Sequence, residues 1–244
     1  MTRGPIRSAR VLSLAGAVVP DIWCPPTLVG TTRDHDPDGL RGTLHFWPGV
    51  MPEFDRDAKK NLRVIAAQTR KLAFEKHGPE AGRLLAAHGL DFLRVPSQTI
   101  VSGFAAIRDE INPADLMTWL HEEGFRMALP VMVGKSQPLV MRTWAPGDIL
   151  EPAAWGIAEP SLDKLEVEPQ VVLVPLLAFD MKGYRLGYGG GFYDSTLAKL
   201  RAKKPVAAVG IAYDEQEVDA VPAESYDQRL DWVLTPSGPK KCET

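Results

Sequence analysis

The sequence has little cysteine. Its 244 residues include only two, Cys24 and Cys242, which lie near opposite ends of the chain. Two cysteines so far apart in the sequence indicate neither a disulfide framework nor a cysteine-based metal cluster. We therefore expect a protein of a reducing compartment, the cytoplasm, that depends on a hydrophobic core for its stability.

The chain also lacks a strong excess of charge and any long apolar run. Its 28 basic and 31 acidic residues give a formal net charge of −3 at pH 7, which provides no electrostatic footprint for nucleic acid. No run of about 18 apolar residues is present, so no segment is predicted to span a membrane. The length and the 45% apolar fraction suit one globular domain with a full core.

The first 50 residues differ in composition from the rest. They contain no lysine but carry 6 prolines and 6 glycines, residues that disfavour regular structure. We expect residues 1–50 to form a poorly structured N-terminal extension and residues 51–240 to form an α/β domain. Because residue 51 is itself a methionine, a misassigned start codon would explain the extension.

Helical and strand patterns alternate along the remainder of the chain. The expected helices cover 54–78, 79–90, 112–124 and 193–202. The expected strands cover 99–104, 126–133, 139–144, 171–179, 205–213 and 232–235. The third helix is the best delimited, with Asn112 as N-cap, Pro113 at the first helical position and Gly124 after its end. Such alternation predicts an α/β fold with a largely parallel sheet.

The segment RLGYGGGFYD at 185–194 combines four glycines with three aromatic residues. Glycine has no Cβ and adopts positive φ, so a run of glycines lets successive N–H groups converge on an anion. A strand is expected before this loop and a helix after it, an arrangement that binds phosphate at the helix N-terminus. The spacing matches neither a dinucleotide fingerprint nor a P-loop. An isolated glycine triplet is more often a flexible turn between two elements, and it is the strand before it and the helix after it that favour the phosphate interpretation.

Six segments together resemble the 5-formyltetrahydrofolate cyclo-ligase family, also called methenyltetrahydrofolate synthetase. They are KKNLR at 59–63, GFAAIRDEI at 103–111, GFRMALPVM at 124–132, GIAEP at 156–160, VPLLAFDMKGYRLGYGGGFYD at 174–194 and VPAESYDQRLDWVLT at 221–235. The resemblance implies ATP- and Mg²⁺-dependent cyclisation of 5-formyltetrahydrofolate to 5,10-methenyltetrahydrofolate, with release of ADP and phosphate. It also implies a three-layer α/β/α fold like that of NagB, RpiA and CoA-transferases, and we expect a monomer.

The resemblance assigns roles to individual residues. The nucleotide would be bound by Lys59, Arg63, Arg185, Leu186, Gly187, Tyr188, Gly189, Gly190, Gly191, Phe192 and Tyr193. Arg185 and Tyr193 would act in catalysis. The reduced folate would contact Phe104, Ala105, Glu110, Tyr188 and Phe192. Asp194 and Asp227 would hold Mg²⁺, which requires the turn around Asp227 to fold back beside the glycine loop.

Four positions depart from the usual family pattern. Phe104 and Phe192 stand where tyrosine is common, Tyr226 where a histidine usually precedes the second aspartate, and Ser195 where arginine often follows the first. The lost hydroxyl groups bear on substrate preference rather than on the phosphate chemistry.

The chemistry implied by the resemblance agrees with what the motif segments lack. A formamide oxygen is a poor leaving group until ATP phosphorylates it, after which N10 of the substrate itself can close the ring. The protein then needs no nucleophile, and all histidines and cysteines lie outside the six segments. Phosphoryl transfer instead requires positioning and charge neutralisation, for which arginine and hard carboxylate ligands of Mg²⁺ are suited.

Two other functions stay open from the residues. One is another enzyme on a related scaffold, such as a sugar-phosphate isomerase or an acyl-CoA-handling protein, which would need its own catalytic groups. The other is a non-catalytic folate- or nucleotide-binding protein. Taken singly, Lys59 and Arg63 also fit a solvated helix face, and Asp194 and Asp227 also fit a helix first turn and a surface turn.

Overall fold

A computed structural model describes residues 54–135, 137–153 and 156–243. The predicted extension at 1–50 and the start of the predicted domain at residue 51 lie outside the described residues. Around the central sheet, the helices are α1 (Phe54–His77), α2 (Glu80–His88), α3 (Ala114–Glu122) and α4 (Phe192–Arg201), with short 3-10 turns η1 (Asp91–Leu93) and η3 (Asp214–Gln216).

The central sheet has eight strands in the order β12-β11-β10-β7-β1-β2-β3-β6. Its strands are β1 (Ile100–Ser102), β2 (Arg126–Val131), β3 (Val140–Thr143), β6 (Glu166–Val167), β7 (Val171–Pro175), β10 (Ala207–Ile211), β11 (Trp232–Thr235) and β12 (Gly238–Lys241). Two small sheets pair β4 (Leu150–Pro152) with β5 (Ala158–Pro160), and β8 (Ala178–Phe179) with β9 (Arg185–Leu186).

The five middle strands of the sheet, from β11 to β2, run parallel to one another. The outer strands β12, β3 and β6 are antiparallel to their neighbours. Only two residues separate β11 from β12, a connection short enough for an antiparallel pair but not for a crossover. The predicted α/β fold with a largely parallel sheet is therefore confirmed.

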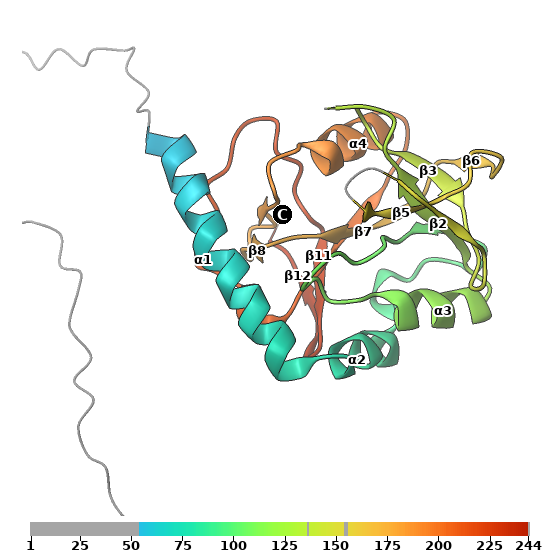
Figure 1. Cartoon of the computed structure of the whole chain (residues 1–244), viewed down its shortest axis with the longest axis horizontal. Helices are drawn as coiled ribbons and strands as arrows, with labels where there is room; N and C mark the ends of the chain where they lie inside the picture. Colours follow the sequence, from blue (N-terminus) through green and yellow to red (C-terminus); the bar gives the residue numbers. More distant parts are fainter. Residues whose placement is uncertain (1–53, 136, 154–155, 244) are drawn as a thin grey trace, which may run out of the picture. The chain divides into compact units, whose positions relative to one another are not determined.

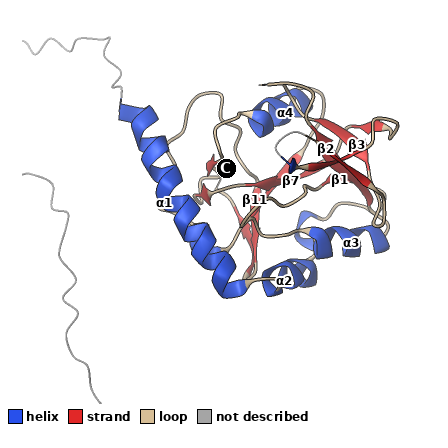
Figure 2. Cartoon of the chain, viewed as in Figure 1, coloured by secondary structure: helices blue, strands red, loops and turns tan. Residues whose placement is uncertain are grey.

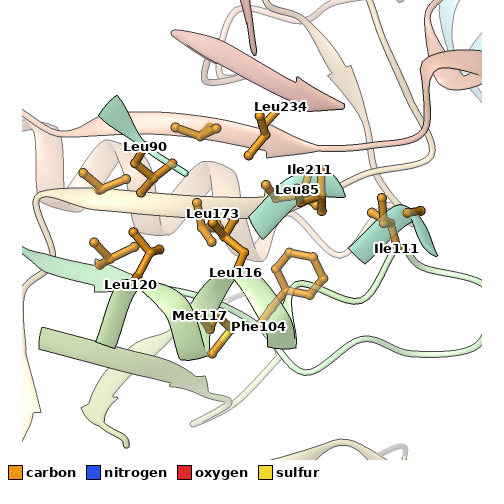
Figure 3. Packing of buried hydrophobic residues seen from close by; sticks show 14 of the residues in the cluster. Leu85, Leu90, Phe104, Ile111, Leu116, Met117, Leu120, Leu173, Ile211 and Leu234 are labelled. Atoms are coloured by element: carbon orange, nitrogen blue, oxygen red, sulfur yellow. The ribbon is translucent and has the colours of Figure 1, made fainter. Parts of the chain in front are cut away.

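Helices cover both faces of this sheet, with α2 and α3 on one side and α4 on the other (Figures 1 and 2). Side chains of a strand point alternately to the two faces, so β7 contributes Val171 and Leu173 to the core cluster under α2 and α3. Its Val172 and Val174 belong to the cluster under α4. Figure 3 shows Leu173 among the side chains of the first cluster. Burial on both faces explains why β7 is a continuous apolar run.

The predicted strand at 171–179 is wrong in extent, because the chain leaves the sheet after β7. The carbonyls of Leu176 and Leu177 accept hydrogen bonds from Nε2 of Gln216, at 2.9 and 3.0 Å. These bonds replace ladder bonds and turn the chain into the β8–β9 hairpin. The third helix begins one residue later than predicted, at Ala114, whose amide donates to Oδ1 of Asn112 at 3.1 Å.

Helix α1 packs beside β8 and β9 (Figure 1). Its Ala66 shares a small apolar cluster with Leu177, Ala178 and Leu186, whereas Ile65 on the outer side is 64% exposed. None of the helices in the described part of the chain combines the length and apolarity that a bilayer crossing requires. The packing of α1 fixes which of its side chains reach the loops beyond the sheet.

Candidate functional site

Segments far apart in the sequence meet beyond the carboxyl ends of the parallel strands. They are α1, the loop 103–113 after β1, and the segment 176–191 after β7, which includes the β8–β9 hairpin and the glycine loop. A further turn at 221–231 is anchored beside them, because Asp180 Oδ2 accepts from the amide of Val221 at 2.9 Å. This edge of a parallel α/β sheet is where ligands bind.

The glycine loop presents backbone donors. Gly189 and Gly191 have φ of 100° and 68°, a region that favours glycine. A Cβ added to Gly190 would lie 2.7 Å from Cε2 of Phe192, so a side chain at this position would displace the Phe192 ring. Within the described residues, the amides of Gly189, Gly190 and Gly191 donate to no acceptor. They precede the N-terminus of α4, and together these features suit an anion such as phosphate.

Arg185 connects the glycine loop to the turn at 221–231. Its Nη2 donates to Oδ1 of Asp194 at 2.7 Å, and its Nη1 donates to the carbonyl of Gln228. The amide of Gln228 in turn donates to the same Asp194 oxygen at 2.9 Å. The turn that carries Asp227 thus folds back beside the glycine loop, as the predicted pairing of the two aspartates requires.

Two basic residues of α1 face the same region. Nζ of Lys59 lies 2.9 Å from Oδ2 of Asp227 and 3.4 Å from Oε1 of Glu224. Burial alone would lower the pKa of Lys59, but the bonds to these two carboxylates outweigh it and raise the pKa. One turn further along, Nε of Arg63 donates to the carbonyl of Gly187 at 3.0 Å. Both side chains therefore lie beside the glycine loop.

Asp194 and Asp227 have the donor set that Mg²⁺ prefers. Each carboxylate uses one oxygen within the protein. Oδ1 of Asp194 accepts from the Arg185 guanidinium and from the amide of Gln228. Oδ2 of Asp227 accepts from Nζ of Lys59 and from the backbone amide of Glu224. Among the described residues, no group donates to the other oxygen of either carboxylate. The described residues include no cluster of three or more metal-ligating side chains, and Mg²⁺ needs only one or two carboxylates beside its waters and phosphates.

The predicted folate residues in the loop after β1 are mostly buried. Phe104 is 4% exposed and belongs to the core cluster under α2 and α3 (Figure 3). Ala105 is half-buried. Glu110 is 6% exposed, and Oε2 accepts from the amide of Ile107 at 3.0 Å. Burial raises the pKa of Glu110, which the Ile107 amide and Arg70 only partly oppose.

The two tyrosines of the glycine loop differ in surroundings. Tyr188 is 49% exposed, so its ring is available to a flat ligand. Tyr193 is half-buried and packs against the cluster under α4. Burial and the nearby charge of Glu110 raise the pKa of Tyr193 above its usual range, against the opposing effect of Arg185. The Tyr193 phenol is therefore a hydrogen-bond donor rather than a base at neutral pH.

Two of the departures from the family pattern also lie in this region. Tyr226 is 63% exposed, and Nζ of Lys59 lies 5.9 Å from the centre of its ring. Oγ of Ser195 donates to the carbonyl of Gly191 at 2.8 Å. A serine at this position thus stabilises the start of α4 instead of extending a charge toward the loop.

Three contributors were not assigned from the sequence. Glu224 and Gln228 lie in the turn at 221–231 and contact Lys59 and Arg185. Arg70 of α1 contacts both the loop after β1 and the glycine loop. Helical spacing was the available signal, because Arg70 follows Arg63 by two turns and therefore shares its helix face.

A shallow depression of about 340 Å³ lies at the opposite, amino end of β1 and β2. Its walls include Gln98, His121, Arg126 and Trp144. None of the predicted site residues lines this depression.

Comparisons with known proteins agree with these features. A model of the 5-formyltetrahydrofolate cyclo-ligase family matches residues 55–236. The chain is 35% identical over 191 residues to 5-formyltetrahydrofolate cyclo-ligase of Mycolicibacterium smegmatis, covering 73% of this chain and 94% of that protein. It is 34% identical over 175 residues to the protein of the same name from Escherichia coli (strain K12), covering 70% of this chain and 96% of that protein.

Two solved structures share the fold. The NMR structure of Aquifex aeolicus 5,10-methenyltetrahydrofolate synthetase gives a TM-score of 0.60 at 23% identity, over 76% of this chain and 93% of that chain. A 5,10-methenyltetrahydrofolate synthetase from Mycoplasma pneumoniae gives a TM-score of 0.57 at 21% identity, over 73% and 98%. At such identities the likeness supports the architecture, which agrees with the layered α/β arrangement described above.

Proposed function

The chain belongs to the 5-formyltetrahydrofolate cyclo-ligase family, and from that premise we propose that the glycine-loop site carries the family's reaction. The activity is the ATP-dependent cyclisation of 5-formyltetrahydrofolate to 5,10-methenyltetrahydrofolate. One observation carries the assignment of the site: the amides of Gly189 to Gly191, which have no acceptor among the described residues, lie in the same loop as Arg185. Phosphoryl transfer requires such donors to be held in place beforehand.

The nucleotide side of the site consists of the glycine loop and the basic face of α1. The amides of Gly189, Gly190 and Gly191 would donate to phosphate oxygens, and Lys59 and Arg63 would neutralise their charge. Arg185 is held by Asp194 and by the Gln228 carbonyl. It would therefore lose little side-chain conformational entropy when it binds the transferred phosphoryl group. This fixed position supports a role in catalysis.

Magnesium is part of the proposal. Asp194 and Asp227 would hold the ion, each through the oxygen that no described residue occupies. The bound ion would neutralise charge on the phosphate groups during transfer. Lys59 contacts Asp227 and Arg185 contacts Asp194. The two positive side chains thus neutralise the charge of the two carboxylates.

The folate side would consist of the loop after β1, with the exposed ring of Tyr188, a residue of the glycine loop, shared between the folate and the nucleotide. Glu110, with its raised pKa, would meet the polar edge of the folate, and the Tyr188 ring would contact a flat part of a ligand. Ala105, which is half-buried, would contact the folate beside Glu110. Phe104, buried in the core, would support the loop from below and expose little of its ring to the substrate, and Phe192 would present its half-buried ring.

The chemistry balances without a protein nucleophile. The formyl oxygen attacks the γ-phosphorus of ATP and ADP leaves. N10 of the substrate then attacks the formyl carbon, loses its proton, and the C–O bond breaks to release phosphate. In agreement, burial raises the pKa of the Cys242 thiol to about 11, with Asp231 and Asp180 adding to the effect, so this thiol stays protonated.

The direct test is an absorbance assay for the methenyl product, with purified protein and 5-formyltetrahydrofolate in the presence and absence of ATP. We expect turnover only with ATP, and only when Mg²⁺ is present. Binding of both ligands without turnover would support the non-catalytic alternative instead. A cytoplasmic location and a monomeric state belong to the same proposal, and sedimentation of the purified protein checks the second.

A further inference from the structure

Arg70 is a charged side chain in the interior of the protein. It lies on α1, on the helix face that also carries the buried residues Ala66 and Ala73, and it is 1% exposed. A guanidinium group that leaves water at this cost is retained only where its donors are satisfied by specific partners. The identity of those partners therefore tells what the residue does.

The partners of Arg70 lie in two loops that the proposed function assigns to different substrates. Nε and Nη2 donate to the two carboxylate oxygens of Asp109, both at 3.1 Å, and Nη1 lies 3.5 Å from Oε1 of Glu110. These acidic residues belong to the loop after β1. Nη2 also donates to the hydroxyl of Tyr188 in the glycine loop. One planar group thus joins the folate side to the nucleotide side.

Tyr188 is held from two directions. The Arg70 guanidinium carbon lies 5.4 Å from the centre of the Tyr188 ring, and that of Arg108 lies 6.0 Å from it. Arg108 has a φ of 56°, an unusual backbone for a residue with a side chain. The Tyr188 ring is thus contacted by α1 through Arg70 and by the loop after β1 through Arg108, and it keeps an exposed face.

Asp109 and the carbonyl of Leu176 accept from three of the five N–H donors of Arg70, the Leu176 bond from Nη1 at 3.3 Å. These contacts attach α1 to the sheet and to the loop after β1. The two remaining donors reach residues that the proposed function places at the ligands. One bonds to Tyr188, the aromatic residue that faces the ligand region, and the other pairs with Glu110, the candidate folate residue.

We propose that Arg70 is a positioning residue that couples the two substrate sites, so that binding of either substrate orders the loop that receives the other. The proposal rests on the proposed function for the identity of the ligands. It assigns Asp109 as the anchor of Arg70 and Tyr188 as the link to the nucleotide. Positive cooperativity follows, because the second ligand binds to loops that the first has already ordered.

Two variants and one control test this coupling. Tyr188→Phe removes only the hydroxyl that Arg70 contacts, and Arg70→Lys keeps the charge but cannot make the planar set of bonds. Arg83→Lys is the control, because Arg83 is an exposed arginine of α2 whose partner is Glu80. Calorimetry measures the Kd of a non-hydrolysable ATP analogue with and without 5-formyltetrahydrofolate, and kinetics measure kcat and both KM values.

We expect the folate to tighten analogue binding about tenfold in the unmodified protein and in Arg83→Lys. In Tyr188→Phe and Arg70→Lys the ratio of the two Kd values, without and with folate, should fall to about one. In the same variants the fold-increase in each KM should exceed the fold-decrease in kcat. Independent binding in the unmodified protein, or an unchanged factor in Tyr188→Phe, would refute the coupling. A protein that turns over substrate normally but shows no coupling contradicts this inference alone, whereas a protein that binds neither ligand contradicts the proposed function as well.

Discussion

Strand β7 and the glycine loop are near neighbours in the chain but have opposite properties. Residues Val171–Val174 are fully buried, and β7 pairs with β1 and with β10. In the loop, Gly189 to Gly191 are exposed, and within the described residues their amides have no acceptor. The strand satisfies its backbone inside the fold, and the loop leaves its backbone donors for a ligand.

This difference separates stability from activity within one segment. Burial of apolar side chains on both faces of β7 contributes to the free energy of folding, whereas free amides and positive φ contribute nothing to it. Substitutions in β7 should therefore change the free energy of unfolding, and substitutions in the loop should change kcat and ligand affinity. The following variants test the separation in order of expected effect.

Leu173→Ala should have the largest effect. The side chain is 0% exposed in the core cluster shown in Figure 3, so its truncation should leave a cavity and lower the free energy of unfolding by about 3 kcal/mol. Urea denaturation measures this loss, with the exposed Leu162→Ala as control. The kcat of the protein that remains folded should change less than twofold. A large loss of kcat without a loss of stability would show that β7 does not act on stability alone.

Asp194→Asn and Asp227→Asn should come next. Each should lower kcat about 100-fold, equivalent to about 2.7 kcal/mol, and raise the Mg²⁺ concentration needed for half-maximal activity, because an amide is a weaker ligand. The double variant should lose less than the sum, since residues that serve one ion are coupled. The exposed Asp219→Asn serves as control. An unchanged Mg²⁺ requirement in Asp227→Asn would remove that residue from the metal site.

Gly189→Ala should have a smaller effect, and Gly147→Ala is its matched control. Both glycines have positive φ, 100° and 92°, so alanine strains both positions similarly. Only at Gly189 would the new Cβ approach a site residue, 3.4 Å from Nη2 of Arg63. We expect ATP affinity to fall about tenfold in Gly189→Ala, measured by calorimetry, and to stay within twofold in Gly147→Ala. Equal losses would show that strain alone is responsible.

The smallest effect concerns pH and lies outside both regions. Burial would raise the pKa of Glu215, but bonds from His77 at 2.8 Å and from Lys76 at 3.0 Å outweigh it and lower the pKa to about 2. A lowered pKa in the folded state stabilises the protein above the ordinary value of 4.5, and this contribution is lost as the pH falls from about 4.5 toward 2.

Glu215→Gln should therefore lower the free energy of unfolding by about 1 kcal/mol at pH 7, after allowance for solvent screening of a partly exposed carboxylate. Urea denaturation at pH 7 and at pH 3 should show that the difference from the unmodified protein shrinks in acid. Glu75→Gln, which removes an exposed pair with Lys71, is the control. A difference that grows in acid would contradict the assigned sign.

The sequence predicted β7 but not the point where the chain leaves the sheet. The apolar run continues past Val174, whereas the turn depends on the Gln216 side chain, which bonds to the carbonyl of Leu176 from 40 residues further along the chain. No local pattern contains that contact. The short strands β4 to β6 escaped prediction for a related reason, because pairs of two or three residues carry too little periodicity.

The glycine loop was readable because its composition is unusual, and the proximity of Asp194 to the turn with Asp227 followed from the family resemblance. For Arg70 the sequence offers only its helical spacing from Arg63, which places it on the same helix face but does not show that it is buried. A single arginine on an amphipathic helix resembles a solvated residue, and its burial depends on Asp109, 39 residues away. Tertiary pairing of this kind cannot be deduced from one sequence.

The ion pair between Lys59 and Asp227 joins residues 168 positions apart. During translation, a nascent chain cannot close this contact until residue 227 has left the ribosome, although α1 can form long before. The ordering of these loops must therefore wait until nearly the whole chain has been synthesised. Chains arrested before that point would be compact yet inactive, and their unpaired basic helix α1 would be open to proteases and chaperones.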